Sequence, residues 1–219
     1  MKVLSRILIC CSILAVTLGA RPFADTTPAP APALSPAEKA RVDGMGVVVR
    51  EVANLGKPGK TYDAIALMRG TLDQAYAVLS DYERYPEFMP NVSATEIVER
   101  KDNETTVNYT LKLPLGKIKK YRLKLWSERS ENKLRIFWTK VPWEGLKDYE
   151  TIADTVGNWT VVPADKEGYL LAVHHVYTDP GKIPAGLGWI VDILTKDSLP
   201  NVLNATRKRI ESLYFNKKE

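Results

Sequence analysis

The pattern of apolar and polar positions along this chain of 219 residues changes its period twice. Between residues 92 and 177, apolar and polar residues alternate in successive short stretches, which is typical of strands with one buried face. The apolar positions of the clearest stretches are Val107, Tyr109, Leu111, Leu113 and Leu115, then Tyr121, Leu123 and Leu125, then Leu134, Ile136 and Trp138. Residues 159–162 and 169–177 supply two more strands. We therefore expect an antiparallel meander joined by tight turns.

The residues before the meander carry signals for both helices and strands. Residues 35–43 and 71–80 each begin with a capping box, Ser-x-x-Glu and Thr-x-x-Gln, so we expect a helix in both. Residues 47–52 and 61–69 flank a turn rich in glycine and proline, which predicts a pair of strands. Residues 81–89 predict a second, short helical turn before the meander begins.

After the meander, the apolar residues return to helical spacing and form one stripe. Its members are Ile183, Leu187, Ile190 and Leu194, followed after Ser198 by Leu199, Val202, Leu203, Ile210 and Leu213. This stripe predicts a terminal amphipathic helix. The apolar faces of the sheet and this helix are hidden from water when they pack against each other. The expected fold class is α+β, with a curved antiparallel sheet wrapped around a long C-terminal helix. Two short helices lie between the early strands.

The N-terminus is typical of a secretory signal peptide. Lys2 and Arg6 precede an apolar run over residues 7–20, which is too short for a comfortable transmembrane helix. Residues 25–34 are rich in proline and predict an extended tether. We expect a signal peptide over 1–24, a tether over 25–34 and a ligand-binding domain over 35–219. The expected location is beyond the inner membrane, in the periplasm.

Much of the positive net charge comes from the expected signal peptide, residues 1–24, and not from the domain. The chain has 31 basic and 26 acidic residues, a formal charge of +5, but removing residues 1–24 takes away three basic residues and no acidic one, leaving +2. Both cysteines also lie in that leader, which excludes a disulfide scaffold or a cysteine-rich zinc site in the mature domain. The basic residues that remain clustered are Lys117, Lys119, Lys120, Arg122 and Lys124. This stripe indicates either transient contact with anionic membrane or a strand face kept soluble by lysines. No nucleic-acid-binding module accompanies it, so we expect no nucleic-acid partner.

The two histidines, His174 and His175, are adjacent in an expected strand and so point to opposite faces. They cannot hold one metal ion together, and we expect neither a metal nor another cofactor. His175 shares a face with Leu171 and Val173. It is interpreted either as a polar contact for a ligand or as a strand histidine with an ordinary hydrogen bond.

Two stretches of the chain resemble a known superfamily. Residues 77–90 read AVLSDYERYPEFMP, and residues 177–184 read YTDPGKIP ahead of the expected last helix. In this spacing around a meander they are similar to the START-like, or helix-grip, superfamily. It includes lipid-transfer domains, polyketide cyclases and coenzyme Q-binding proteins. The resemblance covers about residues 45–215 and implies a domain that grips a hydrophobic ligand. No residue matches a cyclase active-site motif, so no catalytic residue is assigned.

The expected ligand cavity lies between the sheet and the helices and combines apolar bulk with aromatic hydroxyls. Its predicted lining is Tyr85, Phe88, Met89, Tyr109, Leu111, Tyr121, Leu123, Trp138, Trp159, His175, Ile190 and Leu194, with Asp179, Pro180, Gly181 and Pro184 as a gate. The leading hypothesis is binding of a lipid or another hydrophobic small molecule, with its transport left open. Two alternatives stay open. One is a cyclase-like or dehydratase-like enzyme that uses His175 and Tyr109. The other is a protein-interaction module with a closed cavity.

Overall fold

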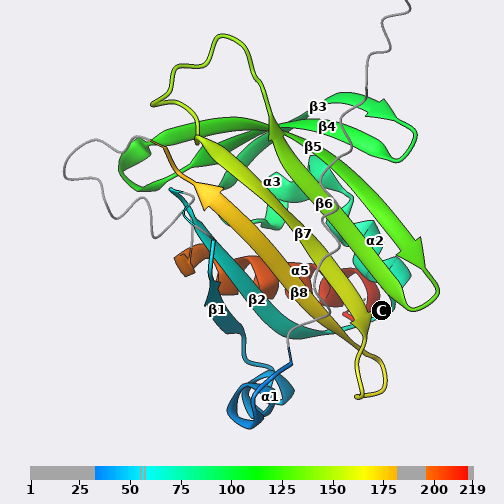
Figure 1. The fold of residues 1–219 in the computed structure, drawn as a ribbon. Helices are drawn as coiled ribbons and strands as arrows, with labels where there is room; N and C mark the ends of the chain where they lie inside the picture. The colour runs from blue at the N-terminus through cyan, green and yellow to red at the C-terminus, as the bar shows by residue number, and fades with distance from the viewer. Residues whose placement is uncertain (1–32, 55, 57, 182–195, 217–219) are drawn as a thin grey trace, which may run out of the picture. The chain divides into compact units, whose positions relative to one another are not determined.

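A computed structural model describes residues 33–54, 56, 58–181 and 196–216, and within them eight strands form one antiparallel sheet (Figure 1). The strands are β1 (Val48–Val52), β2 (Lys60–Arg69), β3 (Val92–Lys101), β4 (Glu104–Lys112), β5 (Ile118–Ser130), β6 (Lys133–Val141), β7 (Asp154–Pro163) and β8 (Tyr169–Asp179). Their order across the sheet is β1-β2-β8-β7-β6-β5-β4-β3. Consecutive strands from β3 to β8 are paired with each other, which is the predicted meander. The last of these, β8, also pairs with β2.

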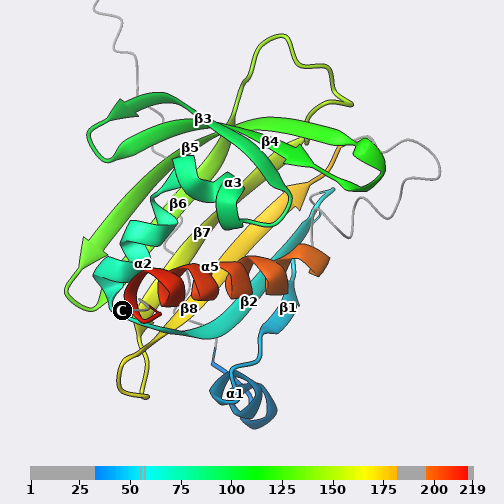
Figure 2. The same ribbon diagram turned by 180° about the vertical axis from the view of Figure 1, so that it is seen from behind.

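The helices cluster on one face of the sheet (Figure 2). They are α2 (Leu72–Leu79), α3 (Tyr85–Phe88) and the long α5 (Leu199–Tyr214), while α1 (Pro36–Asp43) stands at the start of the domain. Single helical turns η1 (Tyr82–Arg84), η2 (Pro114–Gly116) and η3 (Lys196–Ser198) complete the helical segments of the described chain. Helix α5 contacts β2 and α2, and α2 contacts β6 and β7. The α+β helix-grip prediction is therefore confirmed.

Strands β2 and β8 have apolar residues on both faces of the sheet, which the alternation alone did not reveal. On the helix-covered face, Ala64, Ala66 and Met68 of β2 are fully buried in the main core. On the opposite face, Ile65 and Leu67 of the same strand pack in a second cluster. The other buried members of that cluster are Val42 of α1, Val48 of β1 and Val173 of β8. Strands β2 and β8 thus contribute buried residues to both faces.

The apolar stripe of the last helix is observed over most of its described length. Leu199, Leu203, Thr206 and Ile210 are the buried residues of α5. Leu213, which was expected to extend the stripe, is 39% exposed in the last turn of the helix. The first half of the predicted stripe, residues 183–194, lies outside the described residues.

One inward position predicted by alternation is wrong. Leu115 was placed on the buried face with Leu111 and Leu113, but its side chain is 79% exposed. The reason is local: β4 ends at Lys112, and Leu115 lies in the turn η2 with a left-handed φ of +57°. A turn of this kind breaks the two-residue period, so the next apolar side chain points into solvent.

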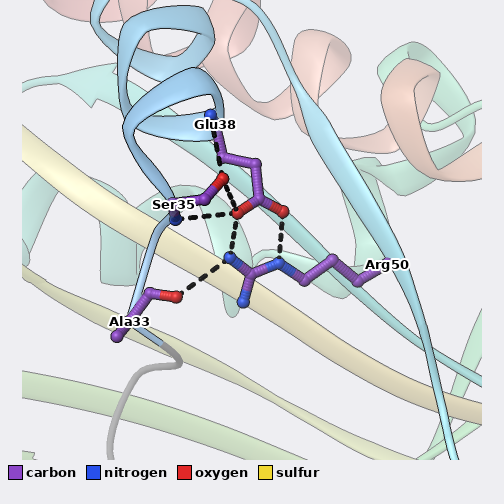
Figure 3. A network of polar contacts seen from close by, with 4 residues as sticks. All are labelled: Ala33, Ser35, Glu38 and Arg50. Carbon is purple, nitrogen blue, oxygen red and sulfur yellow. Dashed lines mark hydrogen bonds and ion pairs between the residues drawn. The ribbon is translucent and has the colours of Figure 1, made fainter.

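The first residues of the domain are fastened to β1 by a polar network (Figure 3). Ser35 Oγ accepts a hydrogen bond from the Glu38 backbone N–H at 3.4 Å, and the Glu38 carboxylate accepts one from the Ser35 backbone N–H at 2.9 Å. This is the predicted capping box. Arg50 Nε and Nη2 donate to the two oxygens of the same carboxylate at 2.6 and 2.5 Å, and Nη2 also donates to the Ala33 carbonyl. The hydrogen bonds from Arg50, followed by those from Ser35, lower the pKa of Glu38 to about 2.

Replacing the cap residue tests how much this network contributes to stability. We expect Ser35→Ala to lower the free energy of unfolding by about 1 kcal/mol, because the first turn of α1 loses its side-chain acceptor. Urea denaturation at neutral pH measures the change. Ser212→Ala, at an exposed serine of α5, is the matched control and should change stability by less than about 0.5 kcal/mol. Equal stability of Ser35→Ala and the parent protein would contradict the expectation.

Candidate ligand-binding cavity

A cavity of about 190 Å³ lies between the sheet and helices α3 and α5. Strands β4 to β8 supply its sheet side. The segment from η1 to the start of β3, Ile152 before β7, Ser198 of η3 and the first turn of α5 supply the rest. Eight of the predicted residues line it: Tyr85, Met89, Tyr109, Leu111, Tyr121, Leu123, Trp138 and Trp159. Alternation along the meander brings these side chains to one face, and the packing of the helices brings the two sides together. Whether they bind a ligand stays a prediction.

Three other predicted residues are not placed in this lining. Phe88 packs edge-to-face on Tyr85, with ring centroids 5.5 Å apart, and its ring also lies under the Arg209 guanidinium. It lines a separate surface pocket with residues of α5. Ile190 and Leu194 lie outside the described residues.

His175 points away from the cavity, which corrects the sequence-based placement. Its Nδ1 lies 2.6 Å from Asp63 Oδ1, and the pair sits on the face that carries Val173 and the second apolar cluster. The alternation correctly grouped His175 with Leu171 and Val173. It could not say which face they share, because β8 presents apolar residues on both.

His174 is the histidine that lines the cavity, and sequence reasoning missed it. In the β7–β8 hairpin it stands directly opposite Trp159, so the two side chains share a face. The signal lay in the turn: Asp-Lys-Glu-Gly at residues 165–168 marks where the hairpin reverses, and counting back from it pairs Trp159 with His174.

The His174 ring is buried and packs against two indoles. Its centroid lies 4.3 Å from that of Trp159 and 5.1 Å from that of Trp138, and the residue is 9% exposed. Burial lowers the pKa of His174 to about 3, so the imidazole is neutral at physiological pH. Gly157 provides room for this arrangement, since a Cβ there would lie 2.4 Å from the Trp138 ring.

A row of tyrosines forms the opposite side of the cavity. Tyr109 and Tyr121 face each other across β4 and β5 with their rings stacked at 5.4 Å, and Tyr85 lies 6.2 Å from Tyr109. The Tyr85 hydroxyl donates to the Leu79 carbonyl at 2.6 Å. Burial raises the pKa of Tyr85, Tyr109 and Tyr121, so all three stay protonated and act as neutral polar groups.

The residues of the predicted basic stripe do not share one face of the sheet, because Lys119 points inward. Lys119 is 5% exposed, because it shares the inward parity of Tyr121, and its Nζ donates to the Thr151 carbonyl at 2.6 Å. Burial lowers the pKa of this lysine. Lys124 forms an ion pair with Glu104, which partly neutralises the charge of the lysine.

Arg122 is likewise engaged within the protein. Its Nε donates to Asn108 Oδ1 at 2.7 Å, and its guanidinium lies over the Trp143 ring. Lys117 lies in the exposed turn before β5, and Lys120 is half-buried, so membrane contact through the stripe stays a prediction.

Residues 179–181, the described part of the predicted gate, form a turn that is held by hydrogen bonds. Asp179 Oδ1 accepts a hydrogen bond from the Gly181 N–H at 2.9 Å, and the Asp179 carbonyl accepts one from the Ala153 N–H. Gly181 has a φ of +75°, a conformation that favours glycine, and Pro180 is buried. Pro184 lies outside the described residues, and the gating role stays a prediction.

The described residues contain no cluster of three or more His, Cys, Asp or Glu side chains placed to hold a metal ion. None of the helices in the described ranges is long and apolar enough to cross a membrane.

Comparison with known proteins identifies the family. A family model described as "Polyketide cyclase / dehydrase and lipid transport" matches residues 69–205, more than half of the chain. The chain therefore belongs to this family, within the START-like superfamily that the sequence motifs resembled. No curated protein sequence matches it.

Solved structures share the fold at low sequence identity. A STAR-related lipid transfer protein from Xanthomonas axonopodis is 19% identical with a TM-score of 0.64, over 76% of this chain and 94% of that one. Human StAR-related lipid transfer protein 5 is 15% identical with a TM-score of 0.61, over 77% and 83% of the two chains. The Zhui aromatase/cyclase from Streptomyces sp. R1128 is 14% identical with a TM-score of 0.56, over 75% and 94%. At these identities the likeness shows the fold.

The burial of His174 predicts a loss of stability in mild acid. Unfolded, this histidine has an ordinary pKa near 6.5, whereas in the folded protein its pKa is about 3. The unfolded state therefore binds the extra proton between these values, and stability falls as the pH drops below 6.5, by roughly 1.4 kcal/mol per pH unit. Urea denaturation at pH 7 and pH 5 should show a loss of about 2 kcal/mol from this group.

His174→Phe is the variant that isolates this effect, because it keeps a ring between the indoles and removes the titrating group. Its loss of stability between pH 7 and pH 5 should be smaller than that of the parent protein by about the same amount. Glu38 has a pKa of about 2 when folded and 4.5 when unfolded, so most of its titration lies below this window and is the same in both proteins. The same pH dependence in both proteins would show that His174 is not the cause.

Proposed function

We propose that this protein binds a hydrophobic small molecule or lipid in the cavity between its sheet and α5, and carries it outside the cytoplasm. The observation that supports this most is the lining, which combines aliphatic side chains with two indoles and several neutral hydroxyls. Apolar surface of a ligand gains about 25 cal/mol for each Å² removed from water, so burying about 200 Å² would contribute about 5 kcal/mol. The family description includes lipid transport, and two of the similar folds belong to lipid transfer proteins.

An enzymatic use of the same cavity is the alternative, and the family description also includes cyclases and dehydrases. General acid–base catalysis works best when a group has a pKa near the working pH. His174 is far below that range and Tyr109 is above its ordinary value, while His175 is on the other face. These observations favour binding over proton transfer.

Export is the second part of the proposal and rests on the first 24 residues of the sequence. A charged start, an apolar run of signal-peptide length and a thiol-free mature domain support it. The intact mass of the protein recovered from the periplasmic fraction tests it. A mass equal to that of the full 219-residue chain, found in the cytoplasm, would contradict export.

The binding proposal is tested by extraction and titration. We expect organic extracts of the purified mature domain to yield a bound hydrophobic molecule by mass spectrometry. Ligand titration should change tryptophan fluorescence, because Trp138 and Trp159 line the cavity. Val202→Phe, which adds bulk from α5 into the cavity, should weaken binding at least tenfold, since the ligand and the new ring compete for one volume.

Asn201→Phe is the matched control, because its side chain is exposed on the neighbouring position of α5 and does not line this cavity. It should leave the affinity unchanged. Repeated failure to extract or titrate any hydrophobic molecule would overturn the proposal. Equal affinity of Val202→Phe and the parent protein would place the ligand elsewhere.

The third part of the proposal is contact with anionic membrane during ligand exchange. Of the five residues of the basic stripe, we now assign this contact to Lys117 and Lys120 alone. The exposed Leu115 and Ile118 lie beside them at the tip of the sheet and add apolar contact. Each cation near an anionic surface contributes about 1 kcal/mol. We expect Lys117→Ala and Lys120→Ala each to lower binding to phosphatidylserine-containing vesicles about fivefold at low salt. Lys124→Ala, which removes an ion-paired lysine, should have little effect in the same flotation assay.

A further inference from the structure

The side chains around the cavity include no ionised group among the residues that the structure describes. Their polar members are tyrosines, threonines, an asparagine, a serine and His174, which is neutral. An ion moved from water into such a site loses several kcal/mol of hydration with no opposite charge to compensate. The cavity therefore selects against carboxylate and phosphate groups in its interior.

Within this neutral lining, several polar groups already have partners inside the protein. The Tyr85 hydroxyl donates to the Leu79 carbonyl. The Thr155 hydroxyl donates to the Tyr177 carbonyl at 2.8 Å and lies 3.4 Å from the Thr178 hydroxyl. These groups are satisfied without a ligand.

His174 differs from them. Its Nδ1 is fully buried and has no hydrogen-bond partner among the described residues. A buried polar atom without a partner is costly, and most such atoms in folded proteins have one. A neutral imidazole has one donor and one acceptor nitrogen, so a hydroxyl, which both donates and accepts, suits either tautomer.

The size and shape of the cavity restrict the ligand further. About 190 Å³ is smaller than the roughly 300–1,000 Å³ of pockets for drug-sized molecules, but larger than an engineered apolar cavity of about 150 Å³ that takes up benzene. The rings of Trp138, Trp159, Tyr109 and Tyr121 all belong to the lining, so much of it is aromatic. Such surfaces favour planar or compact cyclic molecules.

We propose that the cavity takes an uncharged compound of one or two rings whose hydroxyl or carbonyl group forms a hydrogen bond with His174. This inference rests on the proposed binding function and specifies its ligand class. The two indoles that flank His174 hold the ring in place for that contact.

Three matched probes test the ligand class by equilibrium dialysis at pH 7: naphthalene, 2-naphthol and 2-naphthoate. They share one ring system and differ in having no polar group, a hydroxyl or a carboxylate. We expect 2-naphthol to bind about three- to tenfold more tightly than naphthalene, as one net hydrogen bond provides. We expect 2-naphthoate to bind more than about a hundredfold more weakly than 2-naphthol, because its charge must be buried.

Variants of the two adjacent histidines separate the specific contact from general packing. His174→Phe should bind naphthalene and 2-naphthol with equal affinity, since the ring is kept and the nitrogens are lost. His174→Leu serves the same purpose if the phenylalanine variant does not fold. His175→Gln, on the opposite face and paired with Asp63, should keep the preference of the parent protein.

The outcomes distinguish this inference from the function on which it rests. If 2-naphthoate binds as tightly as 2-naphthol, or if both His174 variants keep the hydroxyl preference, the inference is overturned while the binding function stands. If none of the probes binds but an extracted lipid does, the size and charge argument is likewise wrong. If nothing hydrophobic binds at all, the function and the inference fail together.

Discussion

The packing of α5 against one face of the sheet is the constraint on which the rest of this structure depends. Leu203, Thr206 and Ile210 are fully buried in that contact, and small residues of β2, Ala64 and Ala66, lie in the same core. Small side chains let a helix approach a sheet closely. The indoles and phenols of β4 to β7 are far larger, and they line the cavity. Differences in side-chain size across one sheet face thus produce a packed core on one side and a cavity on the other.

The same arrangement explains the electrostatics of the cavity. Residues that point inward from a sheet lose contact with water, so an ionisable group among them is driven toward its neutral form. His174, Tyr109 and Tyr121 follow this rule, and so does Tyr85, which faces them from α3: the histidine pKa is lowered and the tyrosine pKa values are raised. The result is a site rich in neutral hydrogen-bonding groups. Such a site is better suited to recognising a polar atom on an apolar molecule than to moving protons.

The outer face of the sheet has a different role. Near β1, β2 and β8 it is covered by α1, whose first turn is tied to β1 through Glu38 and Arg50. This second apolar cluster stabilises the edge of the sheet against which α5 packs. On the meander side, the outward residues Asn108 and Arg122 form a polar network with Glu96 instead. Solved structures with this fold are 14–19% identical to this chain.

The sequence alone determined the elements of this protein, because capping boxes, turn residues and two-residue alternation are local signals. They predicted the helix at 36–43, the strands of the meander and eight residues that line the cavity. Alternation shows which residues of a strand share a face, but not which face points to the cavity. The second cluster made both faces of β8 apolar, so alternation alone left open which histidine faces the cavity. The pairing of His174 with Trp159 across the hairpin, together with the packing of the helices, decided it. The same limit applies to Lys119, whose burial depends on a carbonyl 32 residues away in the chain. Leu115 points outward because a turn interrupts the period. Local patterns specify local geometry, whereas the direction of a side chain depends on what packs against each face of the sheet.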